Sequence, residues 1–251
     1  MRIIARLDVK NSNLIKSINL EGLKVIGDPN TFAKNYYEDG ADELIFMDLV
    51  ASLYNRNSLH DIIKKASENI FIPFTVGGGI RSVDDALKIF DSGADKIAIN
   101  TAAVKNPELI NNLAKRFGSQ AVVISIEAKK TEKSWEVYIE SGREQTGIDV
   151  ENWVKKTTQL GAGEILLTSI DQEGTGNGFD EGLINIATNS TNIPVIASGG
   201  FGKLEDIQSA SIKSKADAIA IADALHYKKL NLRQIREKAL NLGLNVRNFD
   251  Q

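Results

Sequence analysis

The segment Ile4-Ala5-Arg6-Leu7-Asp8 reappears roughly 120 residues later as Ile124-Ser125-Ile126-Glu127, and both segments end in a carboxylate. Three further pairs of segments match at nearly the same interval and in the same order: Glu43-Leu44-Ile45-Phe46 with Glu164-Ile165-Leu166-Leu167, Val76-Gly77-Gly78-Gly79 with Ala197-Ser198-Gly199-Gly200, and Ala94-Asp95-Lys96-Ile97 with Ala216-Asp217-Ala218-Ile219. Four matched segments in one order indicate two copies of one four-strand unit.

Short apolar runs rich in Ile and Val alternate with helical stretches in each copy, which is typical of parallel strands joined by crossover helices. We therefore predict an α/β fold, a (β/α)8 TIM barrel built from two (βα)4 half-barrel repeats, as a single domain over residues 1–251. The strands are expected at residues 3–8, 43–48, 73–77, 96–100, 121–127, 164–169, 194–198 and 217–222.

The 251 residues carry a formal net charge of −3 with scattered basic side chains, which argues against nucleic-acid or membrane-surface binding and favours small-molecule ligands. The sequence has no cysteine and no long apolar stretch, and Met1 runs directly into a predicted strand. We therefore expect a soluble cytoplasmic protein without a signal peptide. His60 and His226 have no partner at metal-ligand spacing, so we expect no metal and no other cofactor.

Asp8 and Glu127 end the first and fifth predicted strands, which face each other across the mouth where barrel active sites lie. Two opposed carboxylates can act as general acid and base, although they could also be solvated strand-end residues. Arg6 shares a strand face with Asp8 and should point into the barrel, where a guanidinium needs an anionic partner. We predict that Arg6 pairs with Asp8 or Glu127, favours its ionised form and weakens it as a proton donor.

The glycines at 77–79 and 199–200 follow the third and seventh predicted strands, where backbone N–H groups can approach a phosphate. Asn100 and Thr101 would complete the first of these sites. The glycines could instead be required only by tight turns, but their repetition at matched positions favours binding of a phosphorylated small molecule. In the second half, Asp223 places a carboxylate where it would repel phosphate, so the second anion site could be lost.

Two connections at the mouth are longer than barrel geometry requires. Residues 9–28 are rich in Asn, Ser and Gly and predict a mobile lid that carries Lys16. Residues 128–148 contain the alternating segment Trp135-Glu136-Val137-Tyr138-Ile139, which predicts a small hairpin. Because both connections follow the two carboxylates, we expect them to enclose a substrate.

Charged residues begin the first, second, fourth and sixth predicted strands: Arg2, Glu43, Lys96 and Glu164. Such residues ordinarily stabilise the surface at the base of a barrel. The two cations and two anions could instead turn inward as a ring that gates an axial passage.

Over almost its full length the sequence resembles HisF, the cyclase subunit of imidazole glycerol phosphate synthase. The resemblance lies in Leu7-Asp8-Val9-Lys10, Phe74-Thr75-Val76-Gly77-Gly78-Gly79-Ile80, Ile99-Asn100-Thr101-Ala102-Ala103-Val104 and Gly161-Ala162-Gly163-Glu164-Ile165-Leu166-Leu167-Thr168-Ser169-Ile170-Asp171. It implies a barrel that receives ammonia from a HisH-like glutaminase subunit at its N-terminal face. In that family the ammonia reaches a bisphosphorylated ribulosyl intermediate, giving imidazole glycerol phosphate and aminoimidazole carboxamide ribotide.

The resemblance also implies roles for individual residues. Asp8 matches the first catalytic aspartate, Glu127 stands at the second, and Lys16 lies on the substrate loop. The other expected residues are the phosphate-binding set Gly79, Asn100, Thr101, Gly174 and Gly200, the ammonia gate Arg2, Glu43, Lys96 and Glu164, and the partner interface Asp95 and Gln120.

Departures from the family pattern are concentrated in the reaction chamber: Glu127 and Glu173 replace aspartates, Arg6 and Phe201 replace small residues, and Asp223 replaces a serine. A longer catalytic carboxylate and an added negative charge near the second phosphate predict poor cyclase activity. With Leu20-Glu21-Gly22-Leu23 and Asp48-Leu49-Val50-Ala51-Ser52-Leu53-Tyr54-Asn55-Arg56, the departures resemble a second HisF-type protein encoded with bacterial surface-polysaccharide genes.

From this resemblance we expect a barrel that conducts ammonia for amidination of a nucleotide-linked surface sugar. It would form a heterodimer with the glutaminase and take a sugar amidotransferase as a further partner. The alternative is an authentic histidine-pathway cyclase. A third possibility, a stand-alone sugar-phosphate isomerase, leaves the charged residues at the strand starts unexplained.

Overall fold

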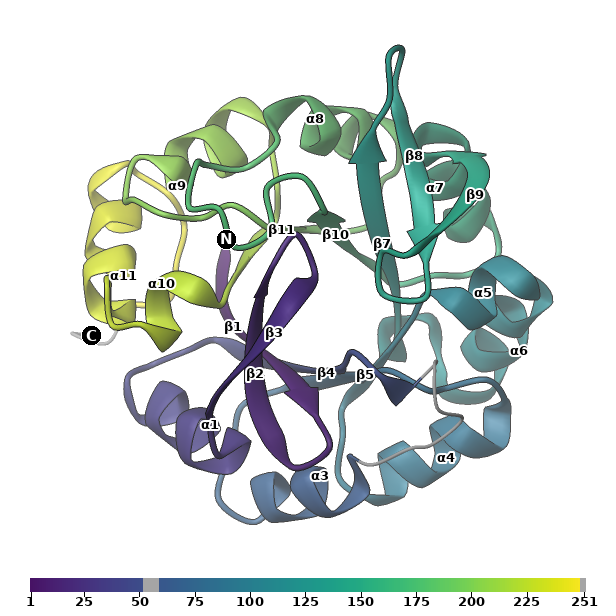
Figure 1. The fold of residues 1–251 in the computed structure, drawn as a ribbon, viewed down its shortest axis with the longest axis horizontal. Coiled ribbons are helices and arrows are strands. Elements are labelled where there is room, and N and C mark those ends of the chain that lie inside the picture. Colours follow the sequence, from purple (N-terminus) through teal and green to yellow (C-terminus); the bar gives the residue numbers. More distant parts are fainter. Residues whose placement is uncertain (52–58, 249–251) are drawn as a thin grey trace.

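Eight parallel strands close into a barrel, and the helices form a ring outside it (Figure 1). In this computed structural model the described residues are 1–51 and 59–248, so part of the motif at 48–56 lies outside them. Pairing of β10 with β7 and of β12 with β1 completes the circle, which confirms the predicted (β/α)8 barrel. The barrel strands are β1 (Arg2–Lys10), β4 (Glu43–Asp48), β5 (Phe74–Gly77), β6 (Lys96–Ile99), β7 (Val122–Lys130), β10 (Glu164–Ser169), β11 (Val195–Ser198) and β12 (Ala218–Ile221).

The helices cover the outer face of the barrel, and the main ones begin at side-chain caps. Asp28, Asp149 and Asp180 each accept a hydrogen bond from the backbone N–H three residues later, which satisfies a donor that the first helical turn leaves unpaired. The helices are α1 (Pro29–Glu38), α3 (His60–Ser67), α4 (Val83–Asp91), α5 (Thr101–Lys105), α6 (Glu108–Phe117), α7 (Val150–Gln159), α8 (Glu181–Ser190), α9 (Asp206–Gln208), α10 (Asp223–His226) and α11 (Leu232–Asn241). Among the helices of the described residues, none has the length and apolar character needed to cross a membrane.

Alternation along the strands divides the apolar side chains into two cores. On β1, Ile3 and Leu7 face the helices and join the larger core. Ile4 points the other way, into a smaller core inside the barrel that includes Ile45, Val123, Leu166 and Ile196. Arg6 and Asp8 share the face of Ile4, so the same alternation carries a cation and an anion into the barrel interior.

Each of the two carboxylate-bearing strands continues into a β-hairpin at the mouth. After β1 come β2 (Asn13–Ile18) and β3 (Glu21–Gly27), and after β7 come β8 (Trp135–Ile139) and β9 (Glu144–Asp149). β2 pairs antiparallel with β1, and β8 pairs antiparallel with β7. The hairpin predicted within residues 128–148 is confirmed, and the half-barrel repeat extends to these insertions.

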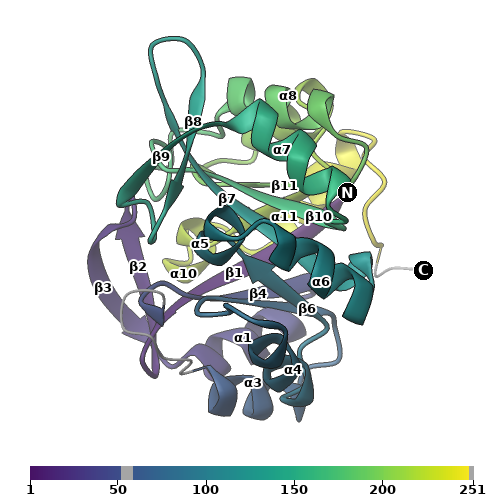
Figure 2. The same ribbon diagram turned by 90° about the vertical axis from the view of Figure 1, so that its right-hand side faces the viewer.

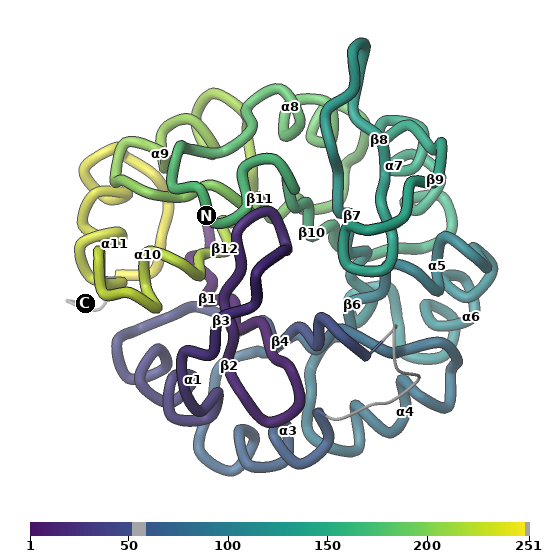
Figure 3. The backbone as a smooth tube through the Cα atoms, viewed as in Figure 1, coloured from purple at the N-terminus to yellow at the C-terminus, as the bar shows by residue number. Residues whose placement is uncertain are grey.

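The segment predicted as a mobile lid, residues 9–28, is a β-hairpin instead. It is held down because Leu14, Ile15, Lys16 and Ser17 are all buried, so β2 is covered on both faces, whereas β3 has no buried residue. Figure 2 shows both hairpins at one end of the barrel, with the chain termini at the other end. Figure 3 shows both hairpins at the mouth, where Leu20 of the first packs in one cluster with Tyr138 of the second.

Candidate active site

The two expected catalytic carboxylates lie inside the mouth but in different surroundings. Asp8 on β1 is fully buried, whereas Glu127 on β7 is 4% exposed and lines a cavity of about 400 Å³. They are close enough for the charge of Asp8 to help raise the pKa of Glu127. Burial rules out the alternative of two solvated strand-end residues.

Arg6 pairs with Asp8, one of the two partners left open by the sequence. Its Nε donates to Oδ1 of Asp8 at 2.9 Å, and its Nη1 donates to the hydroxyls of Thr168 at 2.9 Å and Ser198 at 3.0 Å. Burial lowers the pKa of Arg6, but the neighbouring carboxylates, Asp8 foremost, outweigh it and raise that pKa above its ordinary value. A permanent cation therefore lies beside Asp8 in the barrel interior.

The sequence predicts that Arg6 favours the ionised form of its carboxylate partner, but the pKa of Glu127 is raised and not lowered. Burial raises the pKa of Glu127 to about 7, although the charge of Arg6, the backbone N–H of Gly142 and the Asn100 amide all lower it. The Asn100 amide nitrogen donates to Oε2 of Glu127 at 3.2 Å. Desolvation thus outweighs attraction to the guanidinium, and Glu127 can hold or release a proton near neutral pH.

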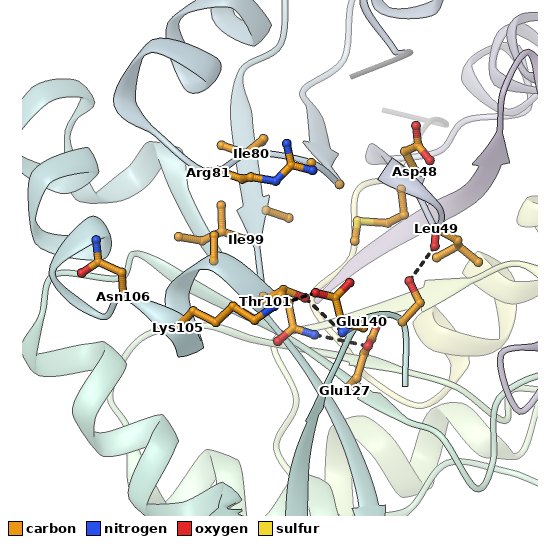
Figure 4. A pocket seen from close by; sticks show the side chains of 17 residues that line it. Asp48, Leu49, Ile80, Arg81, Ile99, Thr101, Lys105, Asn106, Glu127 and Glu140 are labelled. Carbon is orange, nitrogen blue, oxygen red and sulfur yellow. Dashed lines mark hydrogen bonds and ion pairs between the residues drawn. The ribbon is translucent and has the colours of Figure 1, made fainter. Parts of the chain in front are cut away.

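The residues expected at the first phosphate site meet around the cavity of about 400 Å³ (Figure 4). Gly79, Asn100 and Thr101 all line it, together with Glu127. Gly78 has φ +104°, and a Cβ there would lie 2.4 Å from the backbone oxygen of Asp48. This glycine is therefore required by a close backbone approach as well as by its turn, and the loop can present backbone N–H groups to the cavity.

The second phosphate position is much more confined. Gly174 and Gly200 line a cavity of only about 20 Å³, whose wall also includes Arg6, Phe201 and Asp223. This space holds about one water molecule. Phe201 packs against Phe179 with ring centroids 5.9 Å apart, which fills part of the space that a smaller residue would leave.

Two ion pairs lie beside that second cavity. Lys16 on β2 forms a buried ion pair with Glu173, in which the two side chains are 3% and 5% exposed. Asp223 accepts from Lys229 Nζ at 2.5 Å, so its charge is partly neutralised by a lysine at the rim. The hairpin residue expected to contact substrate is thus engaged with a carboxylate of the chain itself.

At the base of the barrel the four expected gate residues turn inward and form a closed ring of ion pairs. Arg2 Nη1 lies 2.7 Å from Glu43 Oε2, and Arg2 also pairs with Glu164. Lys96 Nζ lies 3.0 Å from Oε2 of both glutamates. The glutamate side chains are 2% and 6% exposed, whereas those of Arg2 and Lys96 are 33% and 19% exposed, so the anions of the ring are buried and its cations reach solvent at the base.

The expected partner-facing residues lie around this ring. Gln120 is exposed and lines a shallow cavity of about 600 Å³ together with Arg2, Lys96 and Glu164. Asp95 is exposed, and its Oδ2 accepts from the backbone N–H of Phe74 at 3.0 Å, which fixes the start of β5. The base therefore presents a hollow over the ring.

Four charged residues of the main cavity were not expected from the sequence as site residues: Asp48, Arg81, Lys105 and Glu140. Lys105 lies one helical turn after Thr101, so the spacing on α5 could have indicated it. Glu140 reaches the cavity from the tip of the β8–β9 hairpin, and no local pattern indicates this contact. Within residues 1–51 and 59–248, no cluster of His, Cys, Asp and Glu is suited to hold a metal ion.

Known proteins with similar sequences show which family the chain belongs to. The family model described as "Histidine biosynthesis protein" matches residues 2–231. A Legionella pneumophila protein named "Imidazole glycerol phosphate synthase subunit HisF" is 62% identical over 207 residues, which are 82% of this chain and 98% of that protein. Proteins of the same name from Lactococcus lactis and Natranaerobius thermophilus are 49% and 45% identical over 248 and 246 residues, each 98% of this chain and, respectively, 96% and 98% of those proteins.

These relatives correct the main functional expectation. The matching proteins named above, at up to 62% identity, are subunits of a histidine-pathway synthase, so the interpretation as a sugar-amidination conduit is wrong. A sugar amidotransferase has no support as a partner, and the matches do not support the expectation of poor cyclase activity. The departures at Arg6, Glu127 and Asp223 indicate variation within the reaction chamber more than a different pathway.

Proposed function

Because this chain belongs to the HisF family of histidine biosynthesis proteins, we propose that it is the cyclase subunit of an imidazole glycerol phosphate synthase. In this proposal it combines ammonia with a bisphosphorylated ribulosyl intermediate and releases imidazole glycerol phosphate and aminoimidazole carboxamide ribotide. A cytoplasmic location, expected from the sequence, is part of the proposal.

The observation that carries the proposal is the pair of buried carboxylates with unlike surroundings at the mouth. Asp8 lies against the Arg6 guanidinium at 2.9 Å, whereas Glu127 lines the main cavity. Glu127 has a pKa of about 7, which suits a group that donates a proton at neutral pH. Carboxyl groups whose surroundings separate their proton affinities can divide acid and base roles in one reaction.

The substrate phosphates would occupy the two glycine-lined positions. The cavity at Gly79, Asn100 and Thr101 is large enough for one end of the substrate. At Gly174 and Gly200 the present space is about 20 Å³, so entry of the second phosphate requires its wall to move, and in the proposal Glu173 releases Lys16 in that movement. Lys16 would then exchange a carboxylate partner for a phosphate, which is also an anion.

Ammonia would enter through the ring at the base. In the proposal a HisH-like glutaminase docks over the hollow beside Gln120 and Asp95 and forms a heterodimer with this chain. The ring of Arg2, Glu43, Lys96 and Glu164 lies where such a partner would deliver its product. A stand-alone isomerase would have no use for this inward-turned ring of four charges.

The proposal is tested with the purified chain, the bisphosphorylated ribulosyl substrate and excess ammonium chloride, because ammonia at high concentration needs no partner. We expect aminoimidazole carboxamide ribotide to form, and Glu127→Gln to reduce its rate by roughly 10²-fold or more. Glu132→Gln, at the exposed tip of the β7–β8 connection, is the control and should leave the rate unchanged. If folded parent protein forms no product, the proposed function is wrong.

A further inference from the structure

Two cationic side chains, Lys105 and Arg81, line the main cavity and have no role in the proposed function. Lys105 is the last residue of α5, and Arg81 follows the glycine loop after β5. They share one space, because both side chains line the cavity of about 400 Å³. Two like charges that face one cavity repel each other, and an anion between them relieves that repulsion.

Lys105 is held by a carboxylate that the chain supplies from a distant segment. Lys105 Nζ lies 2.9 Å from Oε1 of Glu140, whose side chain is 11% exposed, while Lys105 is 58% exposed. Figure 4 shows the Lys105 side chain extending from α5 toward Glu140. Ion pairs with one such exposed member contribute little to stability, so this partner can be exchanged readily.

The hairpin tip at residues 140 and 141 also contacts the expected phosphate site. The Glu140 N–H donates to the Thr101 hydroxyl at 3.0 Å, and the Ser141 hydroxyl donates to the Leu49 carbonyl at 2.6 Å. Glu140 has φ +52°, in the left-handed region that glycine favours, so the turn is built to place it there. The turn thus fixes the Glu140 backbone on Thr101, while the Glu140 carboxylate holds Lys105 at the same cavity.

We propose that Lys105 and Arg81 recognise a phosphate of the substrate in the main cavity, and that Glu140 is an internal competitor which holds Lys105 until the phosphate arrives. The identity of the ligand as a substrate phosphate rests on the proposed function. A lysine point charge and an arginine fork, next to a hydroxyl and glycine backbone, are groups that bind phosphate oxygens. Binding would exchange the Lys105–Glu140 pair for a Lys105–phosphate pair.

The exchange predicts opposite effects of two substitutions on the binding of inorganic phosphate. Lys105→Met removes a ligand and should weaken binding about 3- to 10-fold, and Arg81→Met should weaken it in the same direction. Glu140→Gln removes the competitor and should tighten binding about threefold or more. Titrations followed by amide NMR, with Gly79 and Thr101 as reporters, measure the affinity at this cavity.

A second ion pair provides the matched controls. Lys155 and Glu151 form an exposed pair on α7, so Lys155→Met and Glu151→Gln repeat the same chemical changes away from the mouth. Both controls should leave phosphate affinity unchanged. The inference is overturned if Lys105→Met binds phosphate as tightly as the parent, or if Glu140→Gln does not bind it more tightly.

Turnover separates this inference from the proposed function. In the ammonium assay, Lys105→Met should raise KM for the bisphosphorylated substrate with little change in kcat, because it removes binding that ground and transition states share. If the variants shift phosphate affinity as expected but the parent forms no product, the proposed function alone fails. If the parent turns over and Lys105→Met leaves both KM and phosphate affinity unchanged, the inference alone fails.

Discussion

Replacing Glu127 with glutamine should stabilise the folded protein, and the gain should grow as pH rises. The pKa of Glu127 is raised by burial from 4.5 to about 7, so the folded chain binds this proton more tightly than the unfolded chain. Between these two values the unfolded chain has already lost the proton. The free energy of unfolding that Glu127 contributes therefore declines as pH increases from 4.5, and the decline is complete above pH 7.

The size of the effect follows from the two pKa values. Each unit of difference corresponds to about 1.4 kcal/mol, so Glu127 destabilises the fold by about 3 kcal/mol at pH 8 and by almost nothing at pH 4. Glutamine has the shape of the protonated side chain and can still accept hydrogen bonds from Asn100 and Gly142. The variant should therefore equal the parent at pH 4 and exceed it by about 3 kcal/mol at pH 8.

Urea unfolding at a series of pH values measures the difference between variant and parent, in which the other titrating groups cancel. Glu132→Gln is the matched control, because exposed substitutions usually change stability by less than about 0.5 kcal/mol. A difference that stays flat with pH would refute the reasoning. So would a glutamine variant that loses stability relative to the parent as pH rises, since attraction to Arg6 would then outweigh burial.

Three further predictions concern the same chamber. If Glu127 donates a proton, kcat/KM for the bisphosphorylated substrate, measured at a fixed concentration of free NH3, should fall as pH increases through about 7, and a profile that rises there would contradict the assignment. Arg6→Met should lower the free energy of unfolding by about 3–5 kcal/mol, because it leaves Asp8 buried without its cation. Adding Asp8→Asn should recover at least about 2 kcal/mol in urea unfolding, whereas additive losses would show that Arg6 and Asp8 do not stabilise each other. In the same assay, Gly142→Ala should lower the free energy of unfolding by about 1 kcal/mol more than Gly22→Ala. Both glycines have positive φ, but a Cβ at 142 would lie 2.9 Å from a Leu20 methyl, whereas a Cβ at 22 meets nothing within 4 Å. Equal losses would argue against a tightly docked hairpin tip.

The barrel could be predicted from sequence because its signals are local and repeated. Apolar runs of strand length, separated by helical stretches and matched at nearly constant spacing, leave few ways to bury their side chains. The ends of those runs also located the carboxylates, since parallel strands in a barrel all end at one face. The hairpin at residues 13–27 was missed because its Asn, Ser and Gly content resembles a loop, while its burial comes from contacts with distant segments.

The protonation and pairing of the site could not be predicted in the same way. Arg6 needed a partner, and the sequence allowed two. Asp8 lies two residues further along the same strand. Whether Glu127 on β7 lies close enough to compete depends on the distance across the closed barrel, which the sequence does not give. Arg6 also bonds residues 162 and 192 positions away in the chain, which no local pattern encodes. Lys105 and Glu140 meet only because a hairpin tip folds back over α5.

The sequence by itself determined the repeat, the closed barrel and the position of acidic and glycine residues at its mouth, because strand period and segment order are properties of the chain. Only the tertiary structure decided that Glu127 is desolvated enough to hold a proton near pH 7, that Lys16 is occupied by Glu173, and that four charges close a ring at the base. The physical reason is that burial and Coulomb energy depend on distances between segments far apart in sequence, and those distances exist only once the barrel has closed.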